Sequence, residues 1–379
     1  MKNISLVIAL LQIVLVIGLM PEEAFANEAI VGINLVNEPY KQTASEQEAT
    51  LSALQAAGVR VIRASIPGDD HGVDFAERVY AHGMKIHWLV YLSYKPGTPW
   101  PKPPQGHGDM WHYPGLLSTD PIQFKKDFEP LLAKLESKGL EFAGFELGNE
   151  INWTGFNADF PIPGQGKIFG LDDLNNDPEG QKIAQGFLQY LKSLAILKDI
   201  RDHSKLNKKT PIISAGLAIG NNAPGKSWSP VLDGVSINAT IKFLRANGLD
   251  KLVDGYGVHT YPPSNNPGTP QGAKVRKDRL DDIVFTECRP TGSNEGKPCW
   301  LTEWGFPLAS SSCPVDDSKR TMLVREMRGD FYQYIQQARL KGFIYFQWQG
   351  HIHAPHEDPS SIFLCGKVTD GGRLAVAPY

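Results

Sequence analysis

The sequence has almost no net charge. Its 38 Lys and Arg residues against 41 Asp and Glu residues give a formal charge of −3 at pH 7. No polybasic patch therefore indicates binding to nucleic acid or to an anionic membrane. No G-x-G-x-x-G motif follows the first apolar strand candidate, which counts against a dinucleotide-binding fold. After residue 20, no apolar run is long enough to cross a membrane.

The N-terminus has the pattern of a targeting signal. Lys2 precedes an apolar run over 4–20, and the A-F-A at 24–26 is a small-x-small cleavage site. We therefore predict a signal peptide over residues 1–26, with an uncleaved membrane anchor as the alternative. Residues 27–379 would then be a secreted or periplasmic protein that has no membrane contact after cleavage.

Cysteine is scarce, and all four cysteines lie in the last quarter of the chain. In an oxidising compartment, disulfides between loops are the default interpretation. We predict the pairs Cys288–Cys299 and Cys313–Cys365, because the first pair would close a short loop before a strand. A zinc site is the alternative, but no C-x-x-C motif supports it.

Short apolar segments alternate with amphipathic segments along almost the whole chain. Helical segments between short strands are typical of βαβ units and a parallel sheet. Eight such strands favour an α/β fold of the closed (β/α)₈ (TIM) barrel type, with residues 27–379 as one catalytic domain. The eight candidate strands are 29–36, 58–66, 85–94, 140–150, 210–218, 253–261, 298–306 and 342–350.

The connections between these segments are unequal in length. Long Pro- and Gly-rich segments follow the third and fourth strands, whereas short turns lead from each helix into the next strand. Long loops at the carboxyl ends of the strands are typical of barrel enzymes, whose active sites lie there. After the eighth strand the sequence lacks a clear helical period, so we predict a last helix that is short or irregular.

Two glutamates end strand candidates on roughly opposite sides of the expected barrel. Glu150 ends the fourth strand in the stretch LGNE, and Glu303 ends the seventh in LTEWGFP. Catalytic groups in barrels come from these strand ends. Glycoside hydrolysis needs two carboxyl groups on either side of one bond, so the pair is a candidate for that chemistry. The alternative is that both are ordinary surface or salt-bridge residues.

This pair resembles the clan A glycoside hydrolases, in which an asparagine and the acid/base end strand 4 and the nucleophile ends strand 7. The resemblance makes Glu150 the acid/base and Glu303 the nucleophile, and it gives Asn149 the role of binding the sugar 2-hydroxyl. It spans about residues 29–350. Family 39 is the nearest match, with features similar to family 5, although strand 4 ends in NEI rather than NEP.

The same resemblance assigns supporting roles to four further residues. His259 and Tyr261 match the H-x-Y of strand 6, where the tyrosine contacts the nucleophile. Arg63 matches an arginine that pairs with the nucleophile, and Trp348 matches a tryptophan that stacks on the sugar. Arg63 could instead be only the structural partner of Glu146, which strand alternation places deeper in the barrel on the same face as Glu150. Trp348 could be plain core.

Other tryptophans are candidate substrate-binding residues. Trp100, Trp111 and Trp153 lie in the expected rim loops, and we predict that at least one of them stacks on a sugar. Trp304, next to Glu303, is a further candidate. Packing within the loops is the alternative for all of these rings.

The stretch HIHAPHEDP places His351, His353, His356, Glu357 and Asp358 together just after the eighth strand. Histidine and carboxylate ligands can bind a divalent metal. A polar loop that lines the cleft is the favoured interpretation, so we expect neither a metal nor an organic cofactor.

The sequence and its resemblance thus imply a monomeric, exported, retaining β-glycosidase. Its expected substrate is a β-linked poly- or oligosaccharide, such as an exopolysaccharide or a plant cell-wall glycan. Two alternatives stay open: a catalytically silent carbohydrate-binding barrel and a metal-dependent barrel hydrolase.

Overall fold

The computed structural model describes the protein over residues 29–35, 40–102, 113–162, 164–218, 232–350 and 358–379. Its centre is a sheet of eight strands in which neighbouring strands run parallel. In spatial order the strands are β6 (Ile212–Ile213), β4 (Gly144–Leu147), β3 (Lys85–Val90), β2 (Val61–Ala64), β1 (Ile30–Asn34), β10 (Leu340–Tyr345), β9 (Cys299–Trp304) and β8 (Tyr256–Thr260). The predicted signal peptide lies outside the described residues.

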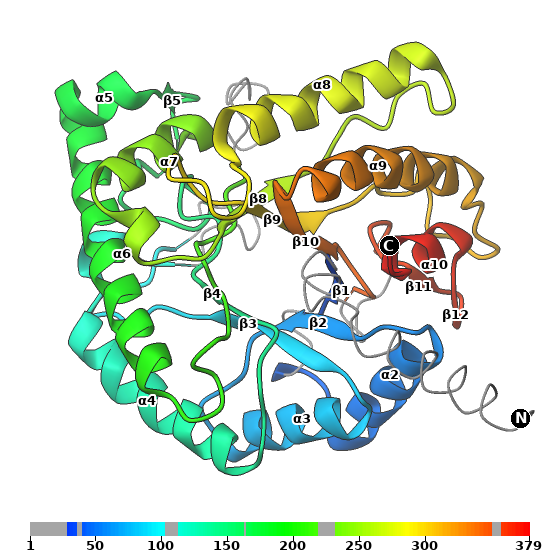
Figure 1. The fold of residues 1–379 in the computed structure, drawn as a ribbon, viewed down its shortest axis with the longest axis horizontal. Helices are drawn as coiled ribbons and strands as arrows, with labels where there is room; N and C mark the ends of the chain where they lie inside the picture. Colours follow the sequence, from blue (N-terminus) through cyan, green and yellow to red (C-terminus); the bar gives the residue numbers. More distant parts are fainter. Residues whose placement is uncertain (1–28, 36–39, 103–112, 163, 219–231, 351–357) are drawn as a thin grey trace, which may run out of the picture.

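The two ends of this sheet meet, so the strands form a nearly closed barrel. Parallel bridges join Ile213 to Gly255 and Leu217 to Val258, which connects the β6 edge to the β8 edge. Figure 1 shows the helices arranged around the outside of the strands. The predicted (β/α)₈ barrel is confirmed.

Most of the α-helices begin at a residue whose side chain caps the first turn. In α3, for example, the Asp69 side chain accepts a hydrogen bond from the Gly72 N–H at 3.0 Å, which satisfies an amide at the helix N-terminus. The α-helices are α2 (Ala44–Ala56), α3 (Asp70–Ala81), α4 (Pro121–Ser137), α5 (Leu171–Asn176), α6 (Pro178–His203), α7 (Ile237–Ala246), α8 (Pro270–Glu287), α9 (Ser318–Gln336) and α10 (Asp370–Val376). With 7 residues, α10 is the predicted short last helix, and it packs against α9 and β1.

Shorter elements decorate the loops. They are the 3₁₀ turns η3 (Leu116–Ser118) and η5 (Leu249–Lys251), the parallel pair β5 (Ile168–Phe169) and β7 (Gly234–Val235), and the antiparallel pair β11 (Phe363–Leu364) and β12 (Lys367–Val368).

The two faces of the sheet differ in polarity. Outward-facing rings pack on the helices: Trp88 on β3 lies 5.0 Å from Phe128 of α4 and 6.0 Å from Phe145 of β4, measured between ring centroids. Inside the barrel, by contrast, Arg63 and Glu146 are fully buried. Since buried charges need partners, the barrel interior is the place to look for a site.

Two disulfides hold the last quarter of the chain. Cys288 pairs with Cys299 and Cys313 pairs with Cys365, as predicted, and this contradicts the zinc alternative because all four thiols are consumed. Across the described residues, no helix has the length and apolar character needed to span a membrane.

Candidate active site

Arg63 organises the barrel interior. Its guanidinium donates two hydrogen bonds to Glu146, at 2.7 and 2.9 Å, and one each to Asn34, Glu303 and Asn149, at 2.8, 2.8 and 2.7 Å. A guanidinium has five N–H donors, so all of them are used. Burial alone would lower the pKa of Arg63, but the nearby Glu146 and Glu303 carboxylates raise it above its usual value.

Glu146 is the fully buried anion of this network. Besides Arg63, it accepts hydrogen bonds from His87 at 3.0 Å, from the Thr302 hydroxyl at 3.0 Å and from the Gly216 N–H at 3.1 Å. Burial alone would raise the pKa of Glu146, but the charge of Arg63 and the hydrogen bonds from His87 and Arg63 hold it well below its usual range. The expected Arg63–Glu146 ion pair is confirmed, and Arg63 also reaches Glu303.

A β-bulge delivers Glu303 into the barrel. The register between β8 and β9 shifts so that Val258 faces Leu301 while His259 faces Glu303. Because of this extra residue, both Thr302 and Glu303 turn inward, towards Glu146 and Arg63 respectively. Bulges often re-aim a side chain beside an active site, and this one does so for a candidate catalytic carboxylate.

Each oxygen of Glu303 has a defined donor. Oε1 accepts from Arg63 at 2.8 Å, and Oε2 accepts from the Tyr261 hydroxyl at 2.5 Å. The Tyr261 ring is half exposed at the cleft. Burial of its hydroxyl end and the nearby Glu303 and Glu150 carboxylates raise the pKa of Tyr261 well above its usual value, so it stays a donor.

Glu150 sits on a strained backbone. Its φ of 46° lies in the left-handed region that side chains rarely adopt, two residues after Gly148 with φ of 77°. Its N–H donates to the Gly216 carbonyl at 2.8 Å, which holds the turn in place. The turn aims the carboxylate at two donors: Trp153 Nε1 on Oε2 at 2.8 Å and His259 Nδ1 on Oε1 at 2.7 Å.

His259 lies between the two glutamates. Its Nδ1 is 2.7 Å from Glu150 and 3.6 Å from Glu303. Burial would lower the pKa of His259, but Glu303 and Glu150 raise it above its usual value. The ring fits only because residue 216 is glycine, since a Cβ there would lie 2.0 Å from His259 Nε2.

The three groups are close enough to act on one bond. One ligand-type atom each from Glu150, His259 and Glu303 lie within 4.8 Å of one another. Such a cluster also meets the geometric requirement for holding a divalent cation. The predicted set Asn149, Glu150, His259, Tyr261, Arg63 and Glu303 is thus brought together at the carboxyl ends of the strands.

Two predicted sugar-stacking tryptophans lie elsewhere. Trp304 is fully buried, with its ring 4.9 Å from both Phe331 of α9 and Tyr345, on the outer face of β9. Trp348 is also fully buried and stacks on Phe363 at 5.0 Å. Because a fully buried ring offers no face to a ligand, the structure contradicts both predictions.

Phe346, directly after β10, is the aromatic residue that contacts Tyr261, the partner of Glu303. Its half-buried ring lies 6.2 Å from the Tyr261 ring, in an edge-to-face arrangement. Sequence reasoning missed it because Trp348, two residues on, was the more conspicuous aromatic.

The other tryptophans and the tail residues predicted from the sequence lie in different surroundings. Trp153 contacts Glu150 and is 9% exposed, whereas Trp100 is 59% exposed in the loop after β3. Trp111 lies outside the described residues, as do His351 to Glu357 of the tail segment. Asp358 is described, and its carboxylate accepts from Gln347 at 2.7 Å.

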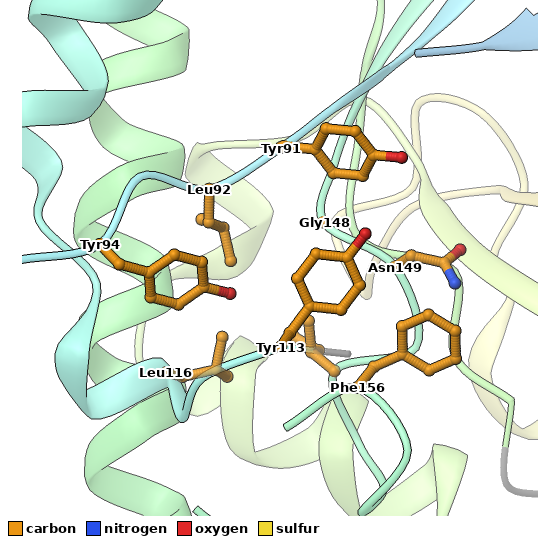
Figure 2. Close-up of a pocket in the computed structure, with 9 residues that line it drawn as sticks. Tyr91, Leu92, Tyr94, Tyr113, Leu116, Gly148, Asn149 and Phe156 are labelled. Carbon is orange, nitrogen blue, oxygen red and sulfur yellow. The ribbon is translucent and has the colours of Figure 1, made fainter. Parts of the chain in front are cut away.

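A small pocket opens beside Asn149. Figure 2 shows Tyr91, Tyr94 and Tyr113 with Phe156 around it, from the loops that follow β3 and β4. Leu92, Leu116 and Ile151 complete a largely apolar lining. None of these tyrosines was assigned a role from the sequence, although Tyr113 lies in the long Pro- and Gly-rich segment predicted after the third strand.

No protein-family model matches the chain, and no curated protein sequence matches it. Solved structures with a similar fold include a family 42 β-galactosidase from G. stearothermophilus (TM-score 0.56, 13% identity, covering 92% of this chain and 55% of that one). They also include an exo-β-1,4-mannosidase from an Opitutaceae bacterium (0.52, 13%, 92% and 58%) and an endocellulase from Pyrococcus horikoshii (0.52, 12%, 92% and 91%).

This chain thus spans little more than half the length of the first two enzymes and nearly all of the third. At such low identity the likeness concerns the fold alone, and it does not show membership of family 39. The protein shares its (β/α)₈ barrel with these glycan-cleaving enzymes.

Proposed function

We propose that the protein is a retaining β-glycosidase in which Glu150 is the acid/base and Glu303 the nucleophile. One observation carries the proposal: carboxylate oxygens of the two glutamates lie within 4.8 Å of each other at the carboxyl ends of β4 and β9. Retaining enzymes place their carboxyl groups about 5–5.5 Å apart, and inverting enzymes about 6.5–9.5 Å apart. The short separation supports double displacement.

The partners of each glutamate support the division of roles. Glu303 is fixed by Arg63 and Tyr261, so one carboxylate is held in a single orientation by two strong donors. Such positioning favours direct attack on the anomeric carbon. Glu150 instead contacts Trp153 and the titratable ring of His259, whose Nδ1 is 2.7 Å from Oε1, as suits a carboxyl group that must take up and release protons.

The reaction then runs in two steps. Protonated Glu150 gives its proton to the glycosidic oxygen while Glu303 attacks the anomeric carbon, which forms a glycosyl ester and frees the leaving sugar. Glu150 next takes a proton from water, which attacks the ester and restores Glu303. Asn149, held by Arg63 through its Oδ1, can donate from its NH₂ to the sugar 2-hydroxyl, and Phe346 takes the stacking role predicted for Trp348.

The substrate class proposed is a β-linked poly- or oligosaccharide outside the cytoplasm. The two disulfides agree with the predicted export, since such bonds persist in oxidising compartments.

The test is hydrolysis of aryl β-glycosides by the wild type and by Glu150→Gln and Glu303→Gln. We expect both variants to lose activity, by about 10²- to 10⁴-fold for the acid/base, and a 2-fluoro glycoside to label Glu303. Glu287→Gln is the matched control, because Glu287 is equally buried but lies at the end of α8 beside the Cys288–Cys299 disulfide. Full activity of Glu303→Gln would refute the assignment and favour a different site.

A metal-dependent hydrolase is the second candidate, because Glu150, His259 and Glu303 form a possible cation site. Activity that survives dialysis against a chelator, and that Zn²⁺ does not increase, would eliminate it. A catalytically silent sugar-binding barrel would bind oligosaccharide without hydrolysing any glycoside.

A further inference from the structure

A continuous run of aromatic rings leads away from the acid/base. The Trp153 ring, whose Nε1 binds Glu150, lies 5.8 Å from Phe156. Phe156 stacks on Tyr113 at 5.8 Å with an interplanar angle of 19°, and Tyr113 lies 6.0 Å from Tyr91 and 5.9 Å from Trp100. We refer to Tyr91, Trp100, Tyr113 and Phe156 as the aromatic wall.

The aromatic wall adjoins the reacting groups through Asn149. Gly148 and Asn149 line the pocket together with Tyr91, Tyr113 and Phe156, and Figure 2 shows the Asn149 side chain beside those rings. Asn149 is the neighbour of Glu150 in the chain and is held by Arg63. A ligand on the aromatic wall would therefore adjoin whatever occupies the space between Glu150 and Glu303.

The backbone under the aromatic wall is tied down. Asn157 Oδ1 accepts from the Leu116 N–H at 3.3 Å, and Asp159 Oδ2 accepts from the Leu117 N–H at 3.1 Å. Glycines make room for the Asp159 carboxylate, because a Cβ at Gly115 or Gly186 would lie 2.1 or 2.2 Å from its oxygens. These contacts join the loop after β3 to the loop after β4, so the rings are positioned before any ligand binds.

The chemistry of the wall suits a sugar ring. Half-buried tyrosines offer a flat apolar face for the C–H face of a pyranose and a hydroxyl for its polar edge. Among the described residues that line the pocket there is no cationic side chain, which argues against a preference for acidic groups. Trp100, 5.9 Å from Tyr113 and 59% exposed, extends the run of rings to the surface.

From these observations we infer that the aromatic wall is a second sugar subsite, adjacent to the one that holds the reacting sugar. This inference rests on the proposed function and deepens it. The enzyme then selects substrates of two or more linked sugars over glycosides of a single sugar, and Tyr113 is the central specificity-determining residue.

The experiment compares two kinds of substrate for the same enzyme. β-Glycosyl fluorides of glucose, galactose and mannose fill only the reacting-sugar position, whereas the matching β-1,4-linked hexasaccharides also reach the wall. For the sugar that the wild type cleaves, Tyr113→Ala should lower the ratio of kcat/KM on hexasaccharide to kcat/KM on fluoride by about 10- to 100-fold, the loss expected for one buried aromatic contact. Tyr113→Phe, which keeps the ring, should lower it far less.

Tyr332→Ala is the matched control, because Tyr332 is an exposed tyrosine on α9, away from the pocket. If Tyr113→Ala does not fold, Tyr91→Ala gives the same comparison. β-Fluorides of the matching disaccharides show on which side of the cleaved bond the second sugar lies. If Tyr113→Ala lowers kcat/KM on them, the second sugar lies on the side of the glycosyl group that Glu303 attacks; if kcat/KM is unchanged, it lies on the leaving-group side.

Two failures are distinguishable. A wild type that hydrolyses no member of the panel overturns the proposed function and the inference with it. An active wild type whose ratio is unchanged in Tyr113→Ala overturns the inference alone.

Discussion

Replacing Arg63 by lysine tests whether the buried arginine serves stability, catalysis or both. Lysine keeps the positive charge but has at most three N–H donors. The wild-type side chain makes five hydrogen bonds to four residues, so at least two are lost. At about 1.5–3 kcal/mol for each bond to a charged group, Arg63→Lys should lower the free energy of unfolding by about 3 kcal/mol or more.

Arg63→Lys should also lower the rate of catalysis, independently of its effect on stability. An ammonium group cannot bridge Glu146, Glu303 and Asn149 together, so Glu303 loses its fixed orientation. A misplacement of about 1 Å in such a group can cost about 100-fold in rate, and we expect a fall of that size in kcat/KM on an aryl β-glycoside.

The measurement pairs urea unfolding with kinetics at a temperature where each variant is folded. Arg201→Lys is the control, since Arg201 is also buried and binds Asp202, Asp254 and the Thr210 carbonyl, away from the cleft. Both variants should be less stable, but only Arg63→Lys should lose specific activity. Equal activity of the two folded variants would refute the reasoning and reduce Arg63 to a structural partner of Glu146.

Three further predictions concern single groups. Tyr261→Phe removes the donor to Glu303 and should lower kcat about 10- to 100-fold with little change in unfolding temperature; an unchanged kcat would contradict this role. Burial raises the pKa of Asp159 to about 6, although the hydrogen bond from the Leu117 N–H lowers it. Between about pH 4 and 6, Asp159 is therefore protonated in the folded state but ionised in the unfolded chain. The contribution of Asp159 to the free energy of unfolding therefore falls by about 3 kcal/mol between pH 4 and 6. In Asp159→Asn, unfolding curves measured across this pH range should show no such fall. Breaking the Cys313–Cys365 disulfide, at a sequence separation of 52, should cost about 4 kcal/mol in unfolding free energy; a cost near zero would show that the reduced chain stays ordered there.

The sequence was sufficient where a regular period determines the structure. Strand alternation put Glu146 beneath Glu150, and the alternation of strands with helices predicted the barrel. The ends of the candidate strands also indicated where Glu150 and Glu303 lie. These inferences succeed because parallel strands in a barrel all deliver their last residues to one rim.

The sequence was insufficient where the chain departs from the regular alternation of a strand. The bulge at Thr302 turns two consecutive residues inward, and alternation cannot predict a bulge. Beyond Tyr345 the strand ends, so Phe346 rather than Trp348 meets Tyr261. Loops have no period at all, which is why Tyr113 and Phe156 became apparent only when the segments after β3 and β4 were seen to lie together.

The left-handed backbone of Glu150 places stability and activity in conflict at a single position. Holding a side chain in that region costs about 1–3 kcal/mol, and glycine would release most of it. The same substitution would remove the acceptor of the Trp153 Nε1 and His259 Nδ1 hydrogen bonds and, under the proposed function, the acid/base itself. Under the proposed function, a related barrel with glycine at this position would therefore have exchanged the acid/base for a relaxed backbone and kept only the capacity to bind sugar.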